Sequence, residues 1–326
     1  MKRILLFITF IWMVLLLLPP ILCRITQDAP SRAENISGDE RIIISLMHTD
    51  TGELEDISLR DYLTGVVMAE MPASFEDDAL MAQAVAARSY TYNKYIENRA
   101  QPGIFPSHNG ADVCTDPAHC KAYMTLSDAR GKWGGEWEEK YYEKICDAVE
   151  NTDKEILTYD AKPVNAVFHS ASYGRTENSR DVWGGDLPYL KSVESPLGEA
   201  AEGQITRVVL SADEFKAQFC EAYPEAVFGD DASEWVNHVV RSEGGSVLSV
   251  SIGGVTLRGN EVRALFSLKS ANFIVTVGEN VCFEVYGSGH GVGMSQYGAN
   301  ALAKDGYDYR AILAHYYTDT QISQWE

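Results

Sequence analysis

The feature that most constrains this chain is an apolar run over residues 4–22, broken by only one Thr and two Pro. A run of this length can cross a bilayer, which takes about 20 apolar residues. Lys2 and Arg3 precede it, and positive charge at this end predicts a cytoplasmic amino terminus with the remaining chain outside the cytoplasm. Residues 18–22 lack the small residues of a signal-peptidase site. We therefore expect residues 1–24 to be a cytoplasmic tip and a retained single-pass anchor.

The composition indicates that most of the chain is folded and faces water. Apolar residues make up 45% of the chain and charged residues 23%, which excludes a disordered chain and a polytopic membrane protein. The chain carries 27 Lys and Arg against 47 Asp and Glu, a net charge of −20. Nucleic acids need basic surface, so we expect no nucleic-acid partner. An anionic ligand would have to meet a local group of Arg or Lys.

Periodicity and turn residues divide the remaining chain into a polar linker, residues 25–40, and one extracytoplasmic domain, residues 41–326. Residues 101–135 are rich in Gly, Pro, Asp, His and Cys, and we expect a long insertion held by something other than a core. The order of elements predicts an α+β fold, with mixed helices and mostly antiparallel strands around a central cleft. The expected helices begin at Ser58 (with Asp61 as capping partner, ending before Pro72) and at Ser74 (with Asp77, running from Phe75 to about Asn98), and cover 136–150, 294–304 and 309–316; the expected strands cover 42–47, 166–168, 247–252, 255–257 and 273–277.

The first predicted helix places an acid on its apolar face. Steps of three and four residues from Leu59 lead along this face to Glu70, just before Pro72. Burial raises the pKa of a carboxyl group, which suits a general acid that works near neutral pH. A helix end that frays toward solvent would also explain this position. The pattern by itself leaves both interpretations open.

Four potential metal ligands lie within the insertion, namely His108, Cys114, His119 and Cys120. Two nitrogen and two sulfur ligands form the set of a closed tetrahedral zinc site, and bound metal would stabilise a loop that has little core of its own. The spacing is not that of a standard zinc finger. A disulfide between Cys114 and Cys120 is the competing interpretation, because disulfides persist outside the cytoplasm.

Three sequence blocks resemble the stage II sporulation protein D family, a bacterial family that acts on peptidoglycan. They occur in the family's order and span most of residues 42–316. The blocks are VMAEMP at 67–72 followed by Phe75 and ALMAQAVAARSY at 79–90; FHS at 168–170 followed by GRTE at 174–177, Trp183 and PYLKSV at 188–193; and GHGVGMSQYGA at 289–299.

The resemblance implies a lytic transglycosylase, which cleaves peptidoglycan glycan strands between N-acetylmuramic acid and N-acetylglucosamine and leaves a 1,6-anhydro end. It implies action during sporulation engulfment, from the mother-cell membrane facing the forespore septum. The substrate would be strands already stripped of stem peptides. The implied partners are a cell-wall amidase, stage II sporulation protein P, and its membrane partner. Clostridial members carry a similar zinc-binding insertion, so the resemblance also implies one structural zinc ion.

The resemblance assigns site residues as well. Glu70 falls on the family's catalytic Glu. Arg88, Tyr189 and Lys191 fall on positions linked to activity, and either cation could hold the lactyl carboxylate of muramic acid. The resemblance implies that the glycine-rich loop at 287–293 lines the cleft and does not bind phosphate. The resemblance makes His290, Ser295 and Gln296 candidate sugar contacts.

Two other functions compete with the transglycosylase. Relatives include proteins described as amidase enhancers, which would make this chain a non-catalytic glycan-binding activator of a cell-wall amidase. Alternatively, the Cys and His residues of the insertion could form a catalytic zinc site of a peptidase or amidase. Four protein ligands would leave no open position on such a zinc ion, which argues against the second alternative.

Overall fold

The computed structural model describes residues 37–135 and 137–325. The anchor expected at residues 1–24 and most of the linker expected at 25–40 lie outside these residues. In the part of the chain that the structure describes, we find no helix that is both long enough and apolar enough to cross a membrane. The compact unit is Gly38–Glu326, so it begins inside the stretch expected to be linker.

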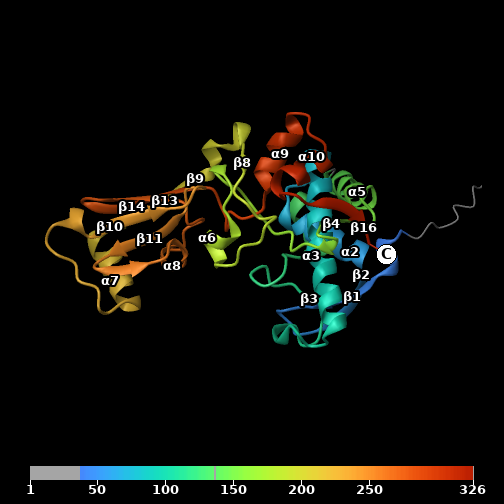
Figure 1. Ribbon diagram of the computed structural model, residues 1–326, viewed down its shortest axis with the longest axis horizontal. Coiled ribbons are helices and arrows are strands. Elements are labelled where there is room, and N and C mark those ends of the chain that lie inside the picture. The colour runs from blue at the N-terminus through green and yellow to red at the C-terminus, as the bar shows by residue number, and fades with distance from the viewer. Residues whose placement is uncertain (1–36, 136, 326) are drawn as a thin grey trace, which may run out of the picture. The chain divides into compact units, whose positions relative to one another are not determined.

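The fold is mixed α and β, as expected, with sheets that are mostly antiparallel (Figure 1). Among the strands of residues 37–135 and 137–325, the pairs β1 with β3 and β6 with β15 are parallel. The helices are α2 (Leu59–Glu70), α3 (Asp77–Ala100), α4 (Leu126–Trp133), α5 (Trp137–Glu150), α6 (Ser179–Trp183), α7 (Ala212–Ala222), α8 (Gly259–Leu265), α9 (Gln296–Lys304) and α10 (Tyr309–Tyr316), with short 3-10 helices η1 (Asp39–Arg41), η2 (Pro106–His108), η3 (Gly198–Ala200), η4 (Glu202–Gln204) and η5 (Ala232–Glu234). The strands are β1 (Ile43–Met47), β2 (Leu54–Ser58), β3 (Val113–Cys114), β4 (Glu155–Tyr159), β5 (Lys162–Pro163), β6 (Phe168–His169), β7 (Gly174–Arg175), β8 (Glu194–Ser195), β9 (Ile205–Ser211), β10 (Val236–Arg241), β11 (Val247–Ile252), β12 (Val255–Leu257), β13 (Phe273–Val277), β14 (Asn280–Tyr286), β15 (Met294–Ser295) and β16 (Gln321–Gln324).

Helix α3 runs through the first of two hydrophobic cores. It packs against α2, α5, α9, α10 and β4 (Figure 1). Its side chains from Ala79 to Ala87 are mostly small, and those on every side of this stretch are buried. Small side chains allow neighbouring backbones to approach closely, and alanine also has the highest helix propensity. The sequence therefore favours a helix that can be surrounded by other elements.

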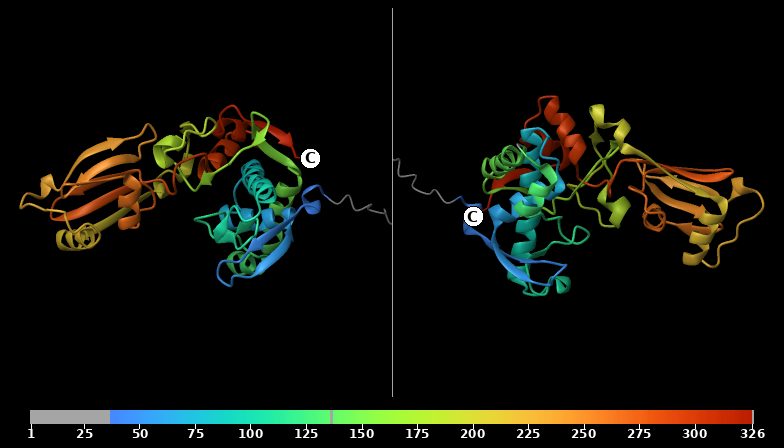
Figure 2. Two further views of the ribbon diagram at one scale, coloured as in Figure 1. Left: turned by 60° about the horizontal axis from the view of Figure 1, so that its bottom comes forward. Right: turned by 180° about the vertical axis from the view of Figure 1, so that it is seen from behind.

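The second core lies between two antiparallel sheets, β13-β14-β9 and β10-β11-β12, which helices α7 and α8 pack against (Figure 2). Alternate residues of β14, Val281, Phe283 and Val285, are fully buried, which is the period-2 pattern of a strand with one buried face. The strands expected at 247–252, 255–257 and 273–277 are confirmed. We did not predict β9, β10, β14 or α7, nor that this half would have its own core.

The N-caps of α2 and α3 differ in how well the local sequence predicts them. Ser58 is the N-cap of α2, and its hydroxyl accepts a hydrogen bond from the N–H of Asp61, as predicted. The second predicted cap is wrong, because α3 begins two residues after Phe75 with Glu76 at its N-cap. The Glu76 N–H donates to the side chain of Asn300 instead. A side chain of α9, more than 200 residues later, therefore fixes the start of α3.

The insertion at 101–135 is better packed than we expected. Strand β3 pairs with β1, and Val113 and Cys114 are buried in the first core. The ring of Tyr123 stacks on Tyr62 of α2 at 5.8 Å between centroids. Gly65 makes room for this ring, because a Cβ there would lie 2.3 Å from it. The core therefore helps to hold the insertion, which corrects the expectation that something else must hold it.

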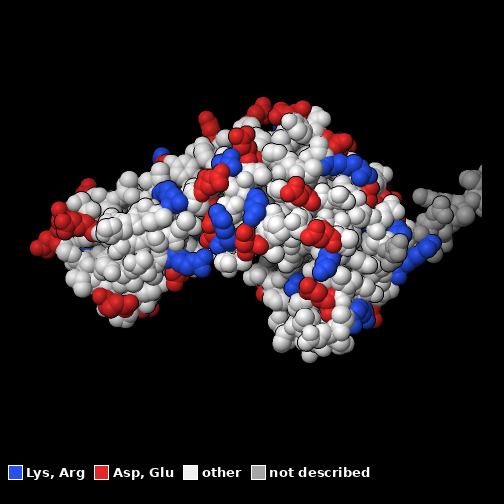
Figure 3. Space-filling view, in the orientation of Figure 1, with Lys and Arg blue, Asp and Glu red and all other residues white. Residues whose placement is uncertain are grey.

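The surface carries acidic and basic side chains side by side. On the face shown in Figure 3, basic residues are interspersed with acidic ones instead of gathering in one stripe. Several of them form exposed pairs, such as Arg207 with Glu284 at 2.6 Å. Exposed pairs of this kind contribute about 0–1 kcal/mol each. An ion pair with both partners buried lies in the interior.

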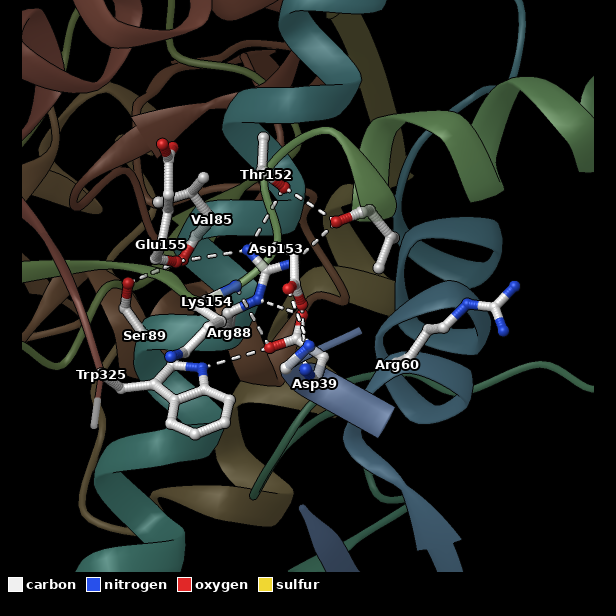
Figure 4. A network of polar contacts seen from close by, with 12 residues as sticks. Asp39, Arg60, Val85, Arg88, Ser89, Thr152, Asp153, Lys154, Glu155 and Trp325 are labelled. Atoms are coloured by element: carbon white, nitrogen blue, oxygen red, sulfur yellow. Dashed lines mark hydrogen bonds and ion pairs between the residues drawn. The ribbon is translucent and has the colours of Figure 1, made fainter. Parts of the chain in front are cut away.

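Arg88 forms that interior pair with Asp39 of η1 (Figure 4). Both side chains are almost fully buried, with 2.6 Å between Arg88 Nε and Asp39 Oδ2. The remaining guanidinium nitrogens donate to Thr152 and to the carbonyls of Val149 and Glu155. Every arm of the guanidinium is therefore used inside the protein. This corrects the expectation that Arg88 binds substrate, because it connects η1 to the first core.

We predict that Arg88→Met lowers the free energy of unfolding by about 3–5 kcal/mol, because the Asp39 carboxylate stays buried without its partner. Urea unfolding would measure the change. Arg207→Met is the matched control, since its ion pair is exposed, and it should leave the free energy of unfolding nearly unchanged. Equal costs for the two variants would contradict this assignment.

Candidate active site

Glu70 is the last residue of α2, and its carboxylate is held between two distant segments. Glu70 Oε1 accepts a hydrogen bond of 3.0 Å from the N–H of Ala122 in the insertion. Glu70 Oε2 lies 3.5 Å from Nε2 of Gln296 at the start of α9. The side chain is half-buried. The apolar face of α2 therefore does lead to an acid that the tertiary structure fixes in place, and the helix does not fray there.

Gln296 brings the third sequence block to the site. Its side chain is only 5% exposed, and Nε2 also lies 3.5 Å from Oε1 of Gln83 on α3. Gln83 is fully buried, and its own Nε2 has no partner among the described residues. Sequence reasoning missed Gln83, although it lies within the first block. A polar side chain on the buried stretch of an Ala-rich helix is the signal that could have revealed it.

Lys121 is the second residue that sequence reasoning missed. It is 7% exposed, and its Nζ lies 4.1 Å from the ring centroid of Tyr90 and 3.9 Å from that of Phe168. Burial lowers the pKa of Lys121 to about 8, and the negative charge of Glu70 is the largest influence in the other direction. Lys121 follows Cys120 directly and precedes Ala122, which holds Glu70. Its position after a ligand candidate was the available signal.

His290 lies beside an exposed aromatic ring. Its ring centroid is 5.0 Å from that of Trp183 and 5.4 Å from that of His169. Its Nδ1 accepts a hydrogen bond from the N–H of Val292. Burial, helped by the nearby His169 and Lys121, holds the pKa of His290 well below its usual value.

Trp183 is 47% exposed and, with His290, lines an open hollow of about 450 Å³. Arg263 and Leu268 contribute to the same hollow. Exposed Trp rings offer a large apolar face with a polar N–H at the edge. Such a face suits the apolar side of a sugar ring.

The four predicted metal ligands converge. One ligand atom of each of His108, Cys114, His119 and Cys120 lies within 4.8 Å of the others. The second ring nitrogen of His108 faces the carbonyl of Ala111 at 3.3 Å, and that of His119 faces the Ser107 hydroxyl at 3.2 Å. Ligand histidines usually have an outer partner of this kind, which fixes the ring. Cys114 and Cys120 are free thiols. The cluster could therefore bind a metal ion, and the disulfide is not formed.

Three of the other predicted contacts have structural partners. The Tyr189 ring is 9% exposed in the first core, and its hydroxyl accepts from the N–H of Asn165. The Ser295 hydroxyl is fully buried and caps α9. Lys191 is bound to Asp186 at 2.6 Å and is about one third exposed. The structure therefore brings Gln296 to Glu70, and it gives Tyr189 and Ser295 partners within the protein, while their predicted contacts with sugar stay predictions.

Comparison with known proteins agrees with the sequence blocks. Residues 47–159 match a family described as "Stage II sporulation protein". The chain is 35% identical over 300 residues to stage II sporulation protein D of Bacillus subtilis (92% of this chain and 84% of the relative) and 33% identical over 293 residues to that of Bacillus amyloliquefaciens (90% and 82%). It is also 27% identical over 312 residues to the amidase enhancer of Bacillus subtilis, covering 81% of this chain and 40% of the relative.

Because His169 is buried, we predict that the protein becomes less stable in acid. Its Nδ1–H donates to the carbonyl of Val292, Nε2 accepts from the Ser172 hydroxyl, and burial lowers the pKa of His169 to about 4. An unfolded His titrates near about 6.5. Because the unfolded chain then binds a proton that the folded chain excludes, the free energy of unfolding should fall by about 3 kcal/mol between about pH 6.5 and 4.

Urea unfolding at several pH values would measure this loss in the wild type and in His169→Asn. The variant should lose less stability across the same pH range, whatever its stability at pH 7. His238→Asn removes an exposed histidine and should keep the wild-type dependence. An unchanged dependence in His169→Asn would show that other groups cause the loss.

Proposed function

The chain belongs to the stage II sporulation protein D family, and from that premise we propose that it is a lytic transglycosylase. We infer that it cleaves the bond between N-acetylmuramic acid and N-acetylglucosamine in glycan strands stripped of stem peptides. The family places the protein in sporulation, and a relative named as an amidase enhancer fits a role at the cell wall. The observation that carries the proposal is the position of Glu70, half-buried and oriented by Ala122 and Gln296.

One carboxyl group can perform the whole reaction. Protonated Glu70 donates its proton to the glycosidic oxygen, and the bond from that oxygen to C1 of muramic acid breaks. The resulting Glu70 carboxylate takes the proton from the C6 hydroxyl, whose oxygen attacks C1 and closes the 1,6-anhydro ring. The proton that leaves Glu70 is thus replaced, and no water is consumed. Most glycosidases instead use a second carboxylate for water or as a nucleophile.

The surrounding residues fit positioning roles in this reaction. The Ala122 N–H can hold one oxygen of Glu70 while the other faces the substrate, and the Gln296 amide can orient that second oxygen. Trp183 and His290 offer a stacking surface for a sugar farther along the strand. A rigid arrangement of this kind reduces the entropy cost of reaching the reactive geometry.

We further propose that the His and Cys cluster holds one structural zinc ion. Ligands about 2.0–2.3 Å from a tetrahedral zinc stand about 3.3–3.8 Å apart. The separation is 3.2 Å between Cys120 Sγ and His108 Nε2 and 3.7 Å between either sulfur and His119 Nδ1. The two ring nitrogens, His108 Nε2 and His119 Nδ1, are closer at 2.8 Å and would have to move apart on a bound ion. Bound zinc would cross-link the insertion. Because Cys120 is two residues from Ala122, a fixed Cys120 also fixes the main chain that holds Glu70.

The proposal includes the location and partners that the family implies. Residues 1–24 would anchor the chain in the mother-cell membrane with the amino terminus in the cytoplasm, and the folded body would face the forespore septum. Stage II sporulation protein P, an amidase, and its membrane partner would supply peptide-free strands. A second candidate function, a non-catalytic activator of an amidase, draws on the relative named as an amidase enhancer.

We predict that Glu70→Gln abolishes cleavage but keeps the fold, because the amide can still accept from Ala122 and cannot donate a proton as an acid. Mass spectrometry of peptide-free strands incubated with residues 25–326 should show 1,6-anhydro ends for the wild type only. Glu76→Gln, an exposed carboxylate at the start of α3, should retain activity. Reducing ends would mean that water attacks, and strands that bind without being cut would favour the activator.

We predict that Cys120→Ser loses bound zinc and unfolds at lower urea concentration, because metal binding energy contributes to folding. Elemental analysis of the purified chain should find about one zinc per wild-type chain. Cys282→Ser, which lies on β14 outside the cluster, should keep its zinc. Zinc retained at wild-type level by Cys120→Ser would rule out this ligand set.

A further inference from the structure

Lys121 presents a cation without an anionic partner. Its ammonium lies between the faces of Tyr90 and Phe168, and no hydrogen-bond acceptor contacts Nζ among the described residues. Nζ is also not among the fully enclosed polar atoms, so it keeps an opening to solvent. Aromatic faces stabilise a cation, but they leave its N–H donors free. The two rings therefore fix the ammonium and leave its N–H donors available to a ligand.

The Lys121 ammonium lies near Glu70, the proposed acid, but does not form an ion pair with it. Lys121 and Glu70 form no ion pair within 4.0 Å in the described structure, although the charge of Glu70 acts on Lys121. They are connected through the main chain, since Ala122 donates to Glu70. His290, the neighbour of Trp183, also lies within electrostatic reach of Lys121. Lys121 therefore lies near both the proposed acid and one residue of the stacking surface.

The protein as a whole carries an excess of negative charge. The chain has a net charge of −20, and acidic side chains are spread over the face seen in Figure 3. An anionic group on a substrate therefore gains little from the surface as a whole and needs a local cation. Arg88, the buried cation of α3, is fully used by Asp39 and main-chain carbonyls. Lys121 is the cation beside Glu70 whose donors are free.

We propose that Lys121 forms a carboxylate-binding subsite next to Glu70 that takes the free lactyl carboxylate of muramic acid. The proposal rests on the proposed substrate. The sugars of a peptidoglycan strand carry neutral hydroxyl and acetamido groups, and the lactyl group is charged only after the stem peptide has been removed. While the peptide is attached, the same carbonyl belongs to a neutral amide. Lys121 would thus select peptide-free strands.

Hydrogen bonds to charged groups are roughly twice as strong as those between neutral groups. We expect about a tenfold difference in affinity, which corresponds to about 1.4 kcal/mol. Selection by Lys121 should therefore appear as about a tenfold preference for the free acid over an amide of the same strand. A lysine with a purely structural role would change stability and leave this preference as it is.

The test measures binding in the non-cleaving Glu70→Gln protein by isothermal titration calorimetry. One ligand is a peptide-free glycan strand, and the other is the same strand with its lactyl carboxylates converted to methylamides. Glu70→Gln should bind the free acid about tenfold more tightly than the methylamide. Adding Lys121→Met should remove this preference and leave the affinity for the methylamide within about twofold.

Three controls separate the ligand role from folding and general charge. Methionine keeps an apolar chain between the two rings, and thermal unfolding should confirm that the variant is folded. Lys121→Arg should keep the preference. Lys94 is another lysine near Tyr90, and its Nζ lies over the ring of Phe105. Lys94→Met should also keep the preference for the free acid.

The outcomes separate this proposal from the proposed function. A preference that persists in Lys121→Met, or no preference in the Glu70→Gln parent, overturns the subsite even when the wild type produces anhydro ends. A preference that depends on Lys121 supports the subsite even when the wild type cleaves nothing. In that case the proposed transglycosylase activity is wrong, and the protein binds glycan strands and recognises their free carboxylates.

Discussion

Close packing around α3 is the constraint on which the first core and the candidate site both depend. The small residues of this helix let α2, α5, α9 and α10 approach it together, so segments far apart in the chain meet along one axis. The polar residues of α3 then face specific partners. Arg88 binds Asp39 in the interior, whereas Gln83 and Tyr90 reach toward Gln296 and Lys121. The same helix is thus a scaffold and a wall of the site.

The insertion couples the His and Cys cluster to Glu70 over a very short stretch of chain. Cys120 belongs to the cluster, Lys121 lies between two rings, and Ala122 donates to the Glu70 carboxylate. Any change that loosens the cluster therefore reaches the acid through two residues of main chain. Strand β3 and the stacking of Tyr123 on Tyr62 anchor the rest of the insertion in the core. This explains how a segment rich in Gly and Pro can hold a carboxylate in one place.

The sequence pointed to the convergence of the four cluster residues, and Gln296 was among the candidates that the structure brings to Glu70. The candidates whose polar groups are used inside the protein share a physical cause. Arg88 and Ser295 belong to informative sequence blocks, but polar residues can occupy such blocks because a buried helix needs an ion pair or a cap. Sequence patterns alone do not distinguish a polar group used by the protein from one left for a ligand. Lys121 was missed for the same reason.

The sequence by itself determined the local elements, since capping at Ser58, apolar periodicity and runs of β-branched residues act over a few residues. It also determined which residue types could perform acid chemistry or bind metal. Only the tertiary structure decided which of them meet, because hydrogen bonds such as Ala122 to Glu70 join segments separated by 52 residues. The tertiary structure also formed the second core. The apolar face of β14 is buried there only because other strands and helices pack against it. Burial and partner choice are properties of the packed chain, and no local pattern contains them.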